Sequence, residues 1–294
     1  MVDNKESMTA KLCAFARAYH SYFIRDKIAD DHLAYDFMGR ESYDSTRRFI
    51  LSRYVNGDTD KLRDFIETYF APIPIARQKF TETRLERFAK GGKCQYVICG
   101  AGADTFSFRN DNEDIEIFEV DHPDTQYFKI DRINTLEWNI PGNVHFVPVD
   151  FNKETMTGGL IKAGFDPGKR TFFSILGVSY YLTLPVFTKT LEQIAELSSP
   201  GSVLVFDFPL PGNDFPERVG YLEHLTEELG EKMSGGFSYS SVSRALYSLG
   251  FQIDTYMPPD KVQKAFFDGR KDGMRAFENV SLLSAEYTGG YAFE

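Results

Sequence analysis

The stretch Gln95-Tyr96-Val97-Ile98-Cys99-Gly100-Ala101-Gly102-Ala103-Asp104-Thr105 is a short apolar run that breaks into two glycines flanking one alanine. A continuous apolar run of this length is typical of a strand buried in a parallel sheet. Gly100 and Gly102 carry no Cβ, so the backbone after the strand can turn sharply and approach a ligand closely. The stretch therefore predicts a strand followed by a nucleotide-type loop.

The loop lacks one feature of dinucleotide-binding folds. Such folds place a third glycine at the position held here by Thr105, where it lets the next helix pack closely. The loop therefore favours a ligand without a pyrophosphate, and S-adenosylmethionine is the commonest of these. Gly100, Ala101 and Gly102 become candidate cofactor contacts. A nicotinamide-dependent oxidoreductase on a similar sheet is the alternative that Thr105 disfavours.

Two further predicted strands end in groups suited to an adenosyl ligand. The run 115–121 ends with Glu119 and Asp121, about 20 residues after the loop, where a ribose-binding acid belongs. The run 144–149 is followed by Asp150 and Phe151, and an acid there can accept from the adenine amine while the next backbone amide serves a ring nitrogen. Open α/β sheets bind ligands at the carboxyl ends of their strands, so three such ends favour one cofactor site.

Purely structural roles for these acids stay open. Carboxylates favour helix amino termini, so Glu119 and Asp121 could cap the helix after the second strand. For Asp121 we favour ribose binding, whereas for Glu119 the sequence favours neither ribose binding nor helix capping. Asp150 could be a loop acid without a ligand.

The remaining pattern predicts a Rossmann-like α/β sheet in a single domain, 1–294. Residues 1–90 have helical spacing and predict a helical cover, in which Pro72 and Pro74 break one run before a helix at about 75–90. Residues 91–294 form the predicted core, with an inserted flap at about 209–237 that interrupts the βα alternation. The other expected elements are strands at 171–176, 202–208, 251–256 and 280–287, a helix at 185–197 and an amphipathic piece at 217–232.

The motifs together resemble the leucine carboxyl methyltransferase family, including its bacterial S-adenosylmethionine-dependent O-methyltransferase branch. The resemblance is carried by Gly100-Ala101-Gly102-Ala103-Asp104-Thr105, Glu119-Val120-Asp121-His122-Pro123 and Asp150-Phe151. It extends to Thr9-Ala10 with Arg17-Ala18, Asp26-Lys27-Ile28-Ala29, Ile75-Ala76-Arg77-Gln78-Lys79-Phe80 and Gly177-Val178-Ser179-Tyr180-Tyr181-Leu182-Thr183. The match covers most of the chain.

The resemblance implies roles for individual residues. Arg77 corresponds to the arginine that holds the cofactor carboxylate, Gly100 to the glycine contact, Asp121 to the ribose acid, and Asp150 with Phe151 to the adenine pair. Lys11 or Arg17 corresponds to a second cation near the carboxylate, and the sequence does not choose between them. Leu176 stands where the family usually has a glutamate, which puts a polar contact from that position in doubt.

Composition narrows the class of protein. The chain of 294 residues has 33 basic and 43 acidic residues and a formal charge of −10, which disfavours nucleic acid and anionic membranes as partners. The amino terminus shows no signal peptide, and three scattered cysteines suit neither a disulfide framework nor a zinc site. We therefore expect a cytoplasmic enzyme without a metal.

The expected function is O-methylation of a small-molecule hydroxyl or carboxylate, with a protein carboxyl terminus as a less favoured acceptor. A carboxylate needs no general base, whereas a hydroxyl does. His122, Tyr180 and His224 are candidate bases, and no catalytic residue is assigned. A non-catalytic cofactor-binding regulatory protein is an alternative, supported by Leu176. The acceptor and the oligomeric state are left open.

Overall fold

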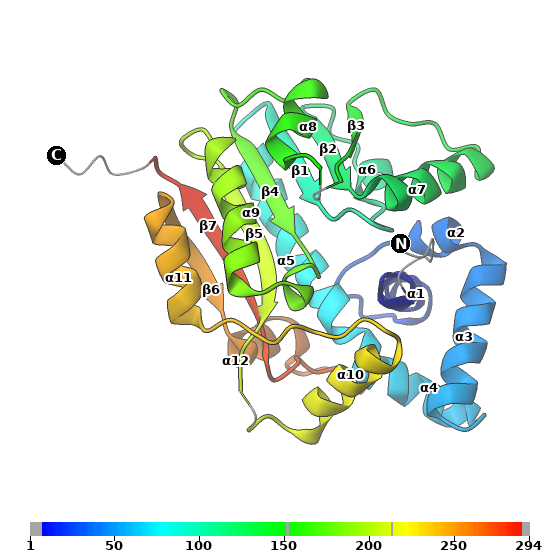
Figure 1. The fold of residues 1–294 in the computed structure, drawn as a ribbon. Helices are drawn as coiled ribbons and strands as arrows, with labels where there is room; N and C mark the ends of the chain where they lie inside the picture. The colour runs from blue at the N-terminus through cyan, green and yellow to red at the C-terminus, as the bar shows by residue number, and fades with distance from the viewer. Residues whose placement is uncertain (1–7, 151–152, 213, 290–294) are drawn as a thin grey trace.

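A seven-stranded sheet with the order β3-β2-β1-β4-β5-β7-β6 forms the centre of the computed structural model, which describes residues 8–150, 153–212 and 214–289 (Figure 1). Strands β1 to β5 run parallel, and β7 pairs antiparallel with both β5 and β6. The expected Rossmann-like sheet is confirmed. Its strands are β1 (Cys94–Cys99), β2 (Ile115–Asp121), β3 (Val144–Pro148), β4 (Thr171–Ile175), β5 (Val203–Pro209), β6 (Phe251–Met257) and β7 (Val280–Tyr287).

Both faces of the sheet are buried, which explains the continuous apolar runs of its strands. In β1, Tyr96 and Ile98 belong to the apolar cluster shared with the N-terminal helices, while Val97 and Cys99 belong to the cluster on the opposite face. The opposite face is covered by α8 (Met156–Lys162), α9 (Leu184–Glu196) and α11 (Tyr239–Ser248), which lie in front of the sheet in Figure 1. Strand β2 leads into α7 (Pro123–Thr135), and α6 (Phe106–Arg109) follows the glycine loop.

The N-terminal part of the chain is helical, as expected for the cover. It comprises α1 (Met8–Phe23), α2 (Ala34–Met38), α3 (Arg40–Tyr54), α4 (Thr59–Phe65), a π-helical turn (Ile66–Phe70) and α5 (Pro72–Ala89). The helical run is interrupted at Ala71, as expected, but the next helix starts at Pro72 rather than at about residue 75, so both prolines lie in the first turn of α5. Proline is tolerated there because the first backbone N–H groups of a helix have no intrahelical acceptor.

The segment between β5 and β6 contains the inserted helix α10 (Glu217–Glu228), drawn in yellow in Figure 1. Buried Arg218 fixes this helix to two distant parts of the chain. Its guanidinium donates to the carbonyl oxygen of Thr68 at 2.9 Å and to that of Ala276 at 3.0 Å. Tyr221 packs on Tyr69 with ring centroids 4.7 Å apart. The insertion is thus anchored beside the N-terminal helices. The smaller elements near the end of the chain are α12 (Pro259–Val262) and a π-helical turn at Gln263–Phe267.

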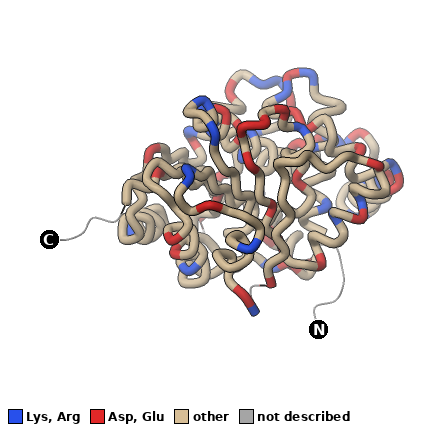
Figure 2. Tube along the Cα trace, turned by 90° about the horizontal axis from the view of Figure 1, so that it is seen from above, with Lys and Arg blue, Asp and Glu red and all other residues tan. Residues whose placement is uncertain are grey.

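Figure 2 shows that basic and acidic residues are interspersed along the chain in the view from above. None of the helices in the described ranges is long and apolar enough to cross a membrane.

Candidate cofactor and acceptor site

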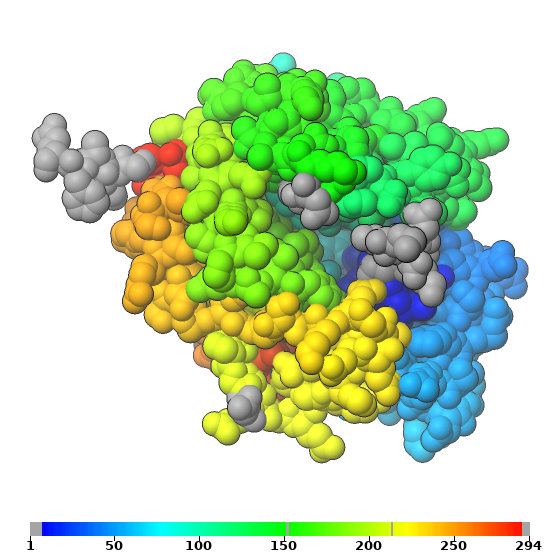
Figure 3. All heavy atoms as spheres, viewed as in Figure 1, coloured from blue at the N-terminus to red at the C-terminus, as the bar shows by residue number. Residues whose placement is uncertain are grey.

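A cavity of about 220 Å³ lies at the carboxyl edge of the central strands, between the sheet, the N-terminal helices and α10. Its walls come from α1, α5, the glycine loop at 100–104, the turn at 176–178 and α10. Figure 3 shows a hollow between the blue, green and yellow segments of the chain. The predicted residues Arg17, Arg77, Gly100, Ala101 and Gly102 all line this cavity, although they are spread over 86 positions of sequence.

The glycine loop has the geometry that its sequence predicts. Gly100 adopts a φ of +77°, and a Cβ there would lie 2.7 Å from the Cγ2 atom of Val178. Only glycine therefore fits this turn without displacing the opposite wall. The Asp121 carboxylate accepts from the Gly102 N–H at 2.6 Å and from the His122 N–H at 2.7 Å. Asp121 thus anchors the loop, and each of its oxygens keeps a second lone pair for a ribose hydroxyl.

Arg77 lies on α5 and faces the cavity, with a guanidinium that is 13% exposed. Its Nη1 atom is 3.4 Å from Oδ2 of the fully buried Asp207. Asp207 also accepts from the Tyr180 hydroxyl at 2.8 Å and from the Gly177 N–H at 2.8 Å. Burial alone would lower the pKa of Arg77, but the Asp207 carboxylate raises it above its ordinary value. A Cβ on Gly177 would collide with the Arg77 guanidinium, so this wall also requires glycine.

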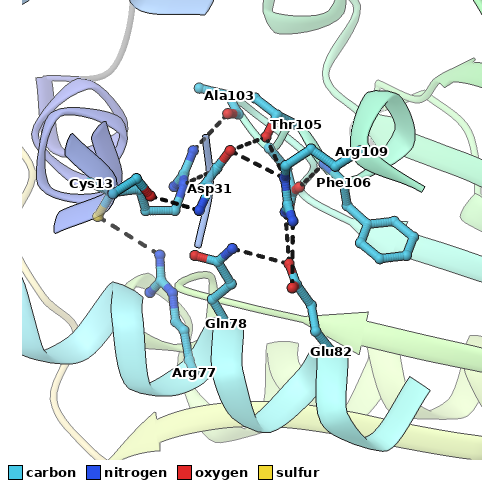
Figure 4. A network of polar contacts seen from close by, with 12 residues as sticks. Cys13, Asp31, Arg77, Gln78, Glu82, Ala103, Thr105, Phe106 and Arg109 are labelled. Atoms are coloured by element: carbon cyan, nitrogen blue, oxygen red, sulfur yellow. Dashed lines mark hydrogen bonds and ion pairs between the residues drawn. The ribbon is translucent and has the colours of Figure 1, made fainter. Parts of the chain in front are cut away.

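Arg17 belongs to a second, larger network. Figure 4 shows the part of that network around Asp31, Thr105 and Arg109. Its Nε atom donates to Asp31 at 2.9 Å, and its Nη2 atom donates to the carbonyl oxygen of Ala103 at 2.6 Å. Asp31 is buried and also bonds Thr105 and Arg109. Burial alone would raise the pKa of Asp31, but the two guanidinium groups lower it below its usual range. Arg17 therefore supports the glycine loop through its hydrogen bond to the carbonyl oxygen of Ala103.

Two other predicted site residues, Asp121 and Asp150, are not among the described residues that line the cavity. Asp150 follows β3 at the same edge of the sheet, and its carboxylate is 2.7 Å from Lys153 Nζ. Phe151 lies outside the described residues, so its adenine contact stays a prediction. Of the two cations considered for the cofactor carboxylate, Arg17 lines the cavity, whereas Lys11 is not among the described lining residues.

Both interpretations of Glu119 were wrong. Its side chain is fully buried within β2, where it pairs with Lys129 Nζ at 2.5 Å and accepts from the Ser107 hydroxyl at 2.5 Å. Burial raises the pKa of Glu119, and Lys129 opposes that rise. His122 caps α7 instead, since its ring accepts from the Asp124 N–H. Lys129 also donates to the carbonyl oxygen of Asp104 at 2.6 Å, so this pair supports the glycine loop rather than a ribose.

The three candidate bases differ in position. His122 and His224 are exposed and lie outside the described lining of the cavity, and His224 faces Glu228 on α10. Tyr180 lines the cavity, but its hydroxyl donates to Asp207. Burial and the Asp207 carboxylate raise the pKa of Tyr180 well above its ordinary value, so this phenol stays protonated.

Asp207 and the network around Asp31 were not predicted from the sequence. Asp207 had a visible signal, because it is an acid inside the apolar run 203–208. Asp31 lies two residues after the block Asp26-Lys27-Ile28-Ala29 but had no local pattern of its own. Gln78 and Glu82 lie one turn apart on the cavity side of α5. Glu82 accepts hydrogen bonds from both Arg109 and Gln78.

The residues present fit S-adenosylmethionine. Gly100 and Gly102 line the cavity without side-chain bulk, and Asp121, which anchors Gly102, retains acceptor capacity that a ribose hydroxyl could use. Arg77 places a cation in the wall for a carboxylate. Two buried oxygen atoms in the same wall, Gln78 Oε1 and Thr81 Oγ1, have no hydrogen-bond partner within the described part of the chain.

Comparison with known proteins agrees with this fit. Residues 10–195 match the family model of the leucine carboxyl methyltransferases. A Bacillus subtilis protein, YktD, is 34% identical over 97% of this chain and 99% of its own length, and is named as a candidate S-adenosyl-L-methionine-dependent methyltransferase. A Streptomyces coelicolor protein with the same kind of name, SCO6443, is 29% identical over 71% of this chain and 68% of its own length.

Solved structures share the fold at low identity. A DUF574 family protein from Streptomyces avermitilis superposes with a TM-score of 0.60 at 14% identity, covering 97% of this chain and 99% of its own. A candidate methyltransferase from Thermobifida fusca gives a TM-score of 0.57 at 12% identity, covering 98% and 97%.

The sheet order, the glycine loop and the acidic strand end define a Rossmann-like methyltransferase that uses S-adenosylmethionine. The chain belongs to the leucine carboxyl methyltransferase family. The nicotinamide alternative is thereby set aside.

Proposed function

We propose that this enzyme transfers the methyl group to an oxygen atom, a hydroxyl or a carboxylate, of a small apolar molecule. The observation that supports such an acceptor is that much of the cavity wall is apolar. Apolar and aromatic side chains from the π-helical turn, the start of α5, α10 and the segment after it enclose part of the cavity. They are Tyr69, Phe70, Ile73, Leu222, Leu225 and Met233.

Burial of an apolar body in such a chamber contributes roughly 25 cal/mol per Å² of apolar surface removed from water. The anchored helix α10 forms one wall of the chamber, so a small molecule fits better than a folded protein. Interspersed surface charges and a net charge of −10 likewise favour a small-molecule partner over nucleic acid or an anionic membrane (Figure 2).

When bound, S-adenosylmethionine supplies an electrophilic methyl group on a sulfonium. The chain's own residues provide alignment: Arg77 holds the carboxylate end, the glycine loop allows close approach, and Asp121 fixes the ribose. Holding two reactants in line in a dry pocket can contribute about 7 to 11 kcal/mol of the barrier. The Tyr180 hydroxyl donates a hydrogen bond to Asp207. Tyr180 is therefore part of the cavity wall and does not act as a base.

The carboxylates of the described lining residues already have donors. Asp31 faces Arg17 and Arg109, Glu82 faces Arg109, and Asp104 accepts from the Phe106 N–H. An acceptor that enters as an anion, such as a carboxylate, needs no proton transfer to any of them. A hydroxyl acceptor would require a further base.

Isotope-labelled S-adenosylmethionine tests the proposal. The enzyme is incubated with a small-molecule extract, and label is followed into low-mass products. A methyl ester releases labelled methanol in mild base, whereas a methyl ether retains the label, so the two oxygen acceptors are distinguished. Label that enters only protein, or only nitrogen or carbon positions, would refute the proposal. Cofactor binding without any turnover would favour the non-catalytic alternative.

A further inference from the structure

Gln78 lies in the cavity wall and has a buried side-chain acceptor without a partner among the described residues. This side chain is 7% exposed, and its Oε1 atom has no hydrogen-bond partner within the described residues. Its Nε2 atom donates to Oε1 of Glu82 at 3.0 Å. An ionised carboxylate can only accept, so this bond fixes the Nε2 end of the amide toward Glu82 and the Oε1 end away from it. A buried acceptor without a donor is unfavourable and calls for an explanation.

The orientation of Gln78 is enforced by several other residues, which Figure 4 shows. Arg109 holds the Glu82 carboxylate through two nitrogens, at 2.7 Å and 3.4 Å. Arg109 in turn donates to Thr105 Oγ1 at 3.0 Å and faces Asp31 at 3.2 Å. A flipped amide would set its carbonyl oxygen against the Glu82 carboxylate. The network therefore keeps the Gln78 carbonyl directed away from Glu82.

The amino-acid end of the cofactor carries a carboxylate and an α-ammonium group. Arg77, the neighbour of Gln78 on α5, is the cation for the carboxylate. The ammonium has three N–H donors and requires acceptors. Asp31 and Glu82 already pair with guanidinium groups, and Leu176 presents an apolar side chain where the resembled family has a glutamate.

We propose that Gln78 Oε1 accepts a hydrogen bond from the α-ammonium group of S-adenosylmethionine. Adjacent residues of α5 then divide the zwitterion: Arg77 binds its anionic part and Gln78 binds its cationic part. Thr81 Oγ1, which is buried and also without a partner in the described structure, lies three residues further along the same wall. The proposal requires that the cavity binds S-adenosylmethionine, but it does not depend on which molecule accepts the methyl group.

Binding calorimetry with three ligands tests this role. The ligands are S-adenosylhomocysteine, its deaminated analogue, which keeps the carboxylate, and methylthioadenosine, which lacks both groups. Gln78→Met removes the amide with little change of volume. We expect this variant to bind S-adenosylhomocysteine roughly tenfold or more weakly than the parent chain, the range for a hydrogen bond to a charged group. It should bind the other two ligands within about twofold of the parent.

Gln78→Asn is the second variant, because it keeps the amide but shortens the side chain. We expect it to show the same ligand selectivity with a smaller loss, and thermal unfolding of each variant confirms that it is folded. Equal losses for all three ligands would make Gln78 a structural residue, and no loss for S-adenosylhomocysteine would place the ammonium elsewhere. Either outcome overturns the proposal. A parent chain that binds none of the ligands would instead refute the cofactor assignment, whereas a wrong acceptor would appear only in turnover.

Discussion

Asp121 Oδ2 accepts a hydrogen bond from the backbone N–H of Gly102 at 2.6 Å, so the second strand of the sheet holds the glycine loop of the first. The two residues are 19 positions apart and belong to adjacent parallel strands. A carboxylate that accepts from the loop cannot shift without moving the loop. Asp121 and the glycine turn therefore form one structural unit.

The first prediction concerns this unit. Asp121→Ala should weaken S-adenosylhomocysteine binding by about 1.5 to 3 kcal/mol, the scale of hydrogen bonds to a charged group. Asp121→Asn should lose less, because the amide oxygen can still accept from Gly102 or from the ribose. Calorimetric titration measures both. If both variants bind like the parent and unfold at the same temperature, Asp121 has neither role.

The second prediction concerns Arg77. A guanidinium can grip a carboxylate through two parallel hydrogen bonds, whereas an ammonium acts as a point charge. Arg77→Lys should therefore bind S-adenosylhomocysteine several-fold more weakly, and Arg77→Ala more weakly still, while methylthioadenosine loses little. Parallel titrations with the two ligands measure the difference. Equal losses for both ligands would assign Arg77 to structure.

Arg77→Ala also leaves the buried Asp207 carboxylate without its cation. An uncompensated buried charge costs about 3 to 5 kcal/mol of stability, so the single variant should unfold more readily. The double variant Arg77→Ala with Asp207→Asn removes both charges and should recover most of that stability. It should not recover affinity for S-adenosylhomocysteine. Denaturant unfolding of the parent, the single variant and the double variant, together with binding titrations, separates the structural role of Arg77 from its binding role.

The third prediction distinguishes Arg17 from Arg77. The Arg17 guanidinium is engaged by Asp31 and by the carbonyl oxygen of Ala103. Its loss should therefore loosen the glycine loop rather than remove a carboxylate contact. We expect Arg17→Ala to weaken S-adenosylhomocysteine and methylthioadenosine by similar factors. A loss confined to S-adenosylhomocysteine would restore Arg17 as the second carboxylate cation.

The centre of the sheet could be predicted from the sequence because β1, β4 and β5 are mostly apolar runs that both faces of the sheet bury. The glycine loop was equally visible, since Gly100 requires a positive φ and an open approach. The start of α5 was placed about three residues too late, because the break before Pro72 was correctly expected but proline is also tolerated in the first turn of a helix.

The charged networks were invisible because their members are far apart in sequence. Arg77 and Asp207 are separated by 130 positions, and Arg17 reaches a carbonyl oxygen 86 positions away. Glu119 was misplaced for a related reason. It precedes Asp121 by two residues and shares its side of the strand, but it lies below the rim, where Lys129 reaches it.

The fourth prediction is a pH dependence of stability that comes from His20. This side chain is fully buried in α1, and its Nε2 atom accepts from the Ile28 N–H at 3.0 Å, which requires a neutral ring. Burial lowers the pKa of His20 from 6.5 to about 4, with Arg270 acting in the same direction and Asp272 and Asp30 opposing it.

Between pH 6.5 and pH 4 the unfolded chain then binds a proton that the folded chain does not. The stability that neutral His20 contributes is therefore complete above pH 6.5 and is lost as the pH falls toward 4, by about 3 kcal/mol in all. His20→Gln keeps an acceptor for Ile28 but cannot titrate. We expect its free energy of unfolding to fall less than that of the parent over this range, measured by urea denaturation at several pH values. Identical pH slopes for the two chains would show that His20 is not protonated on unfolding in this window.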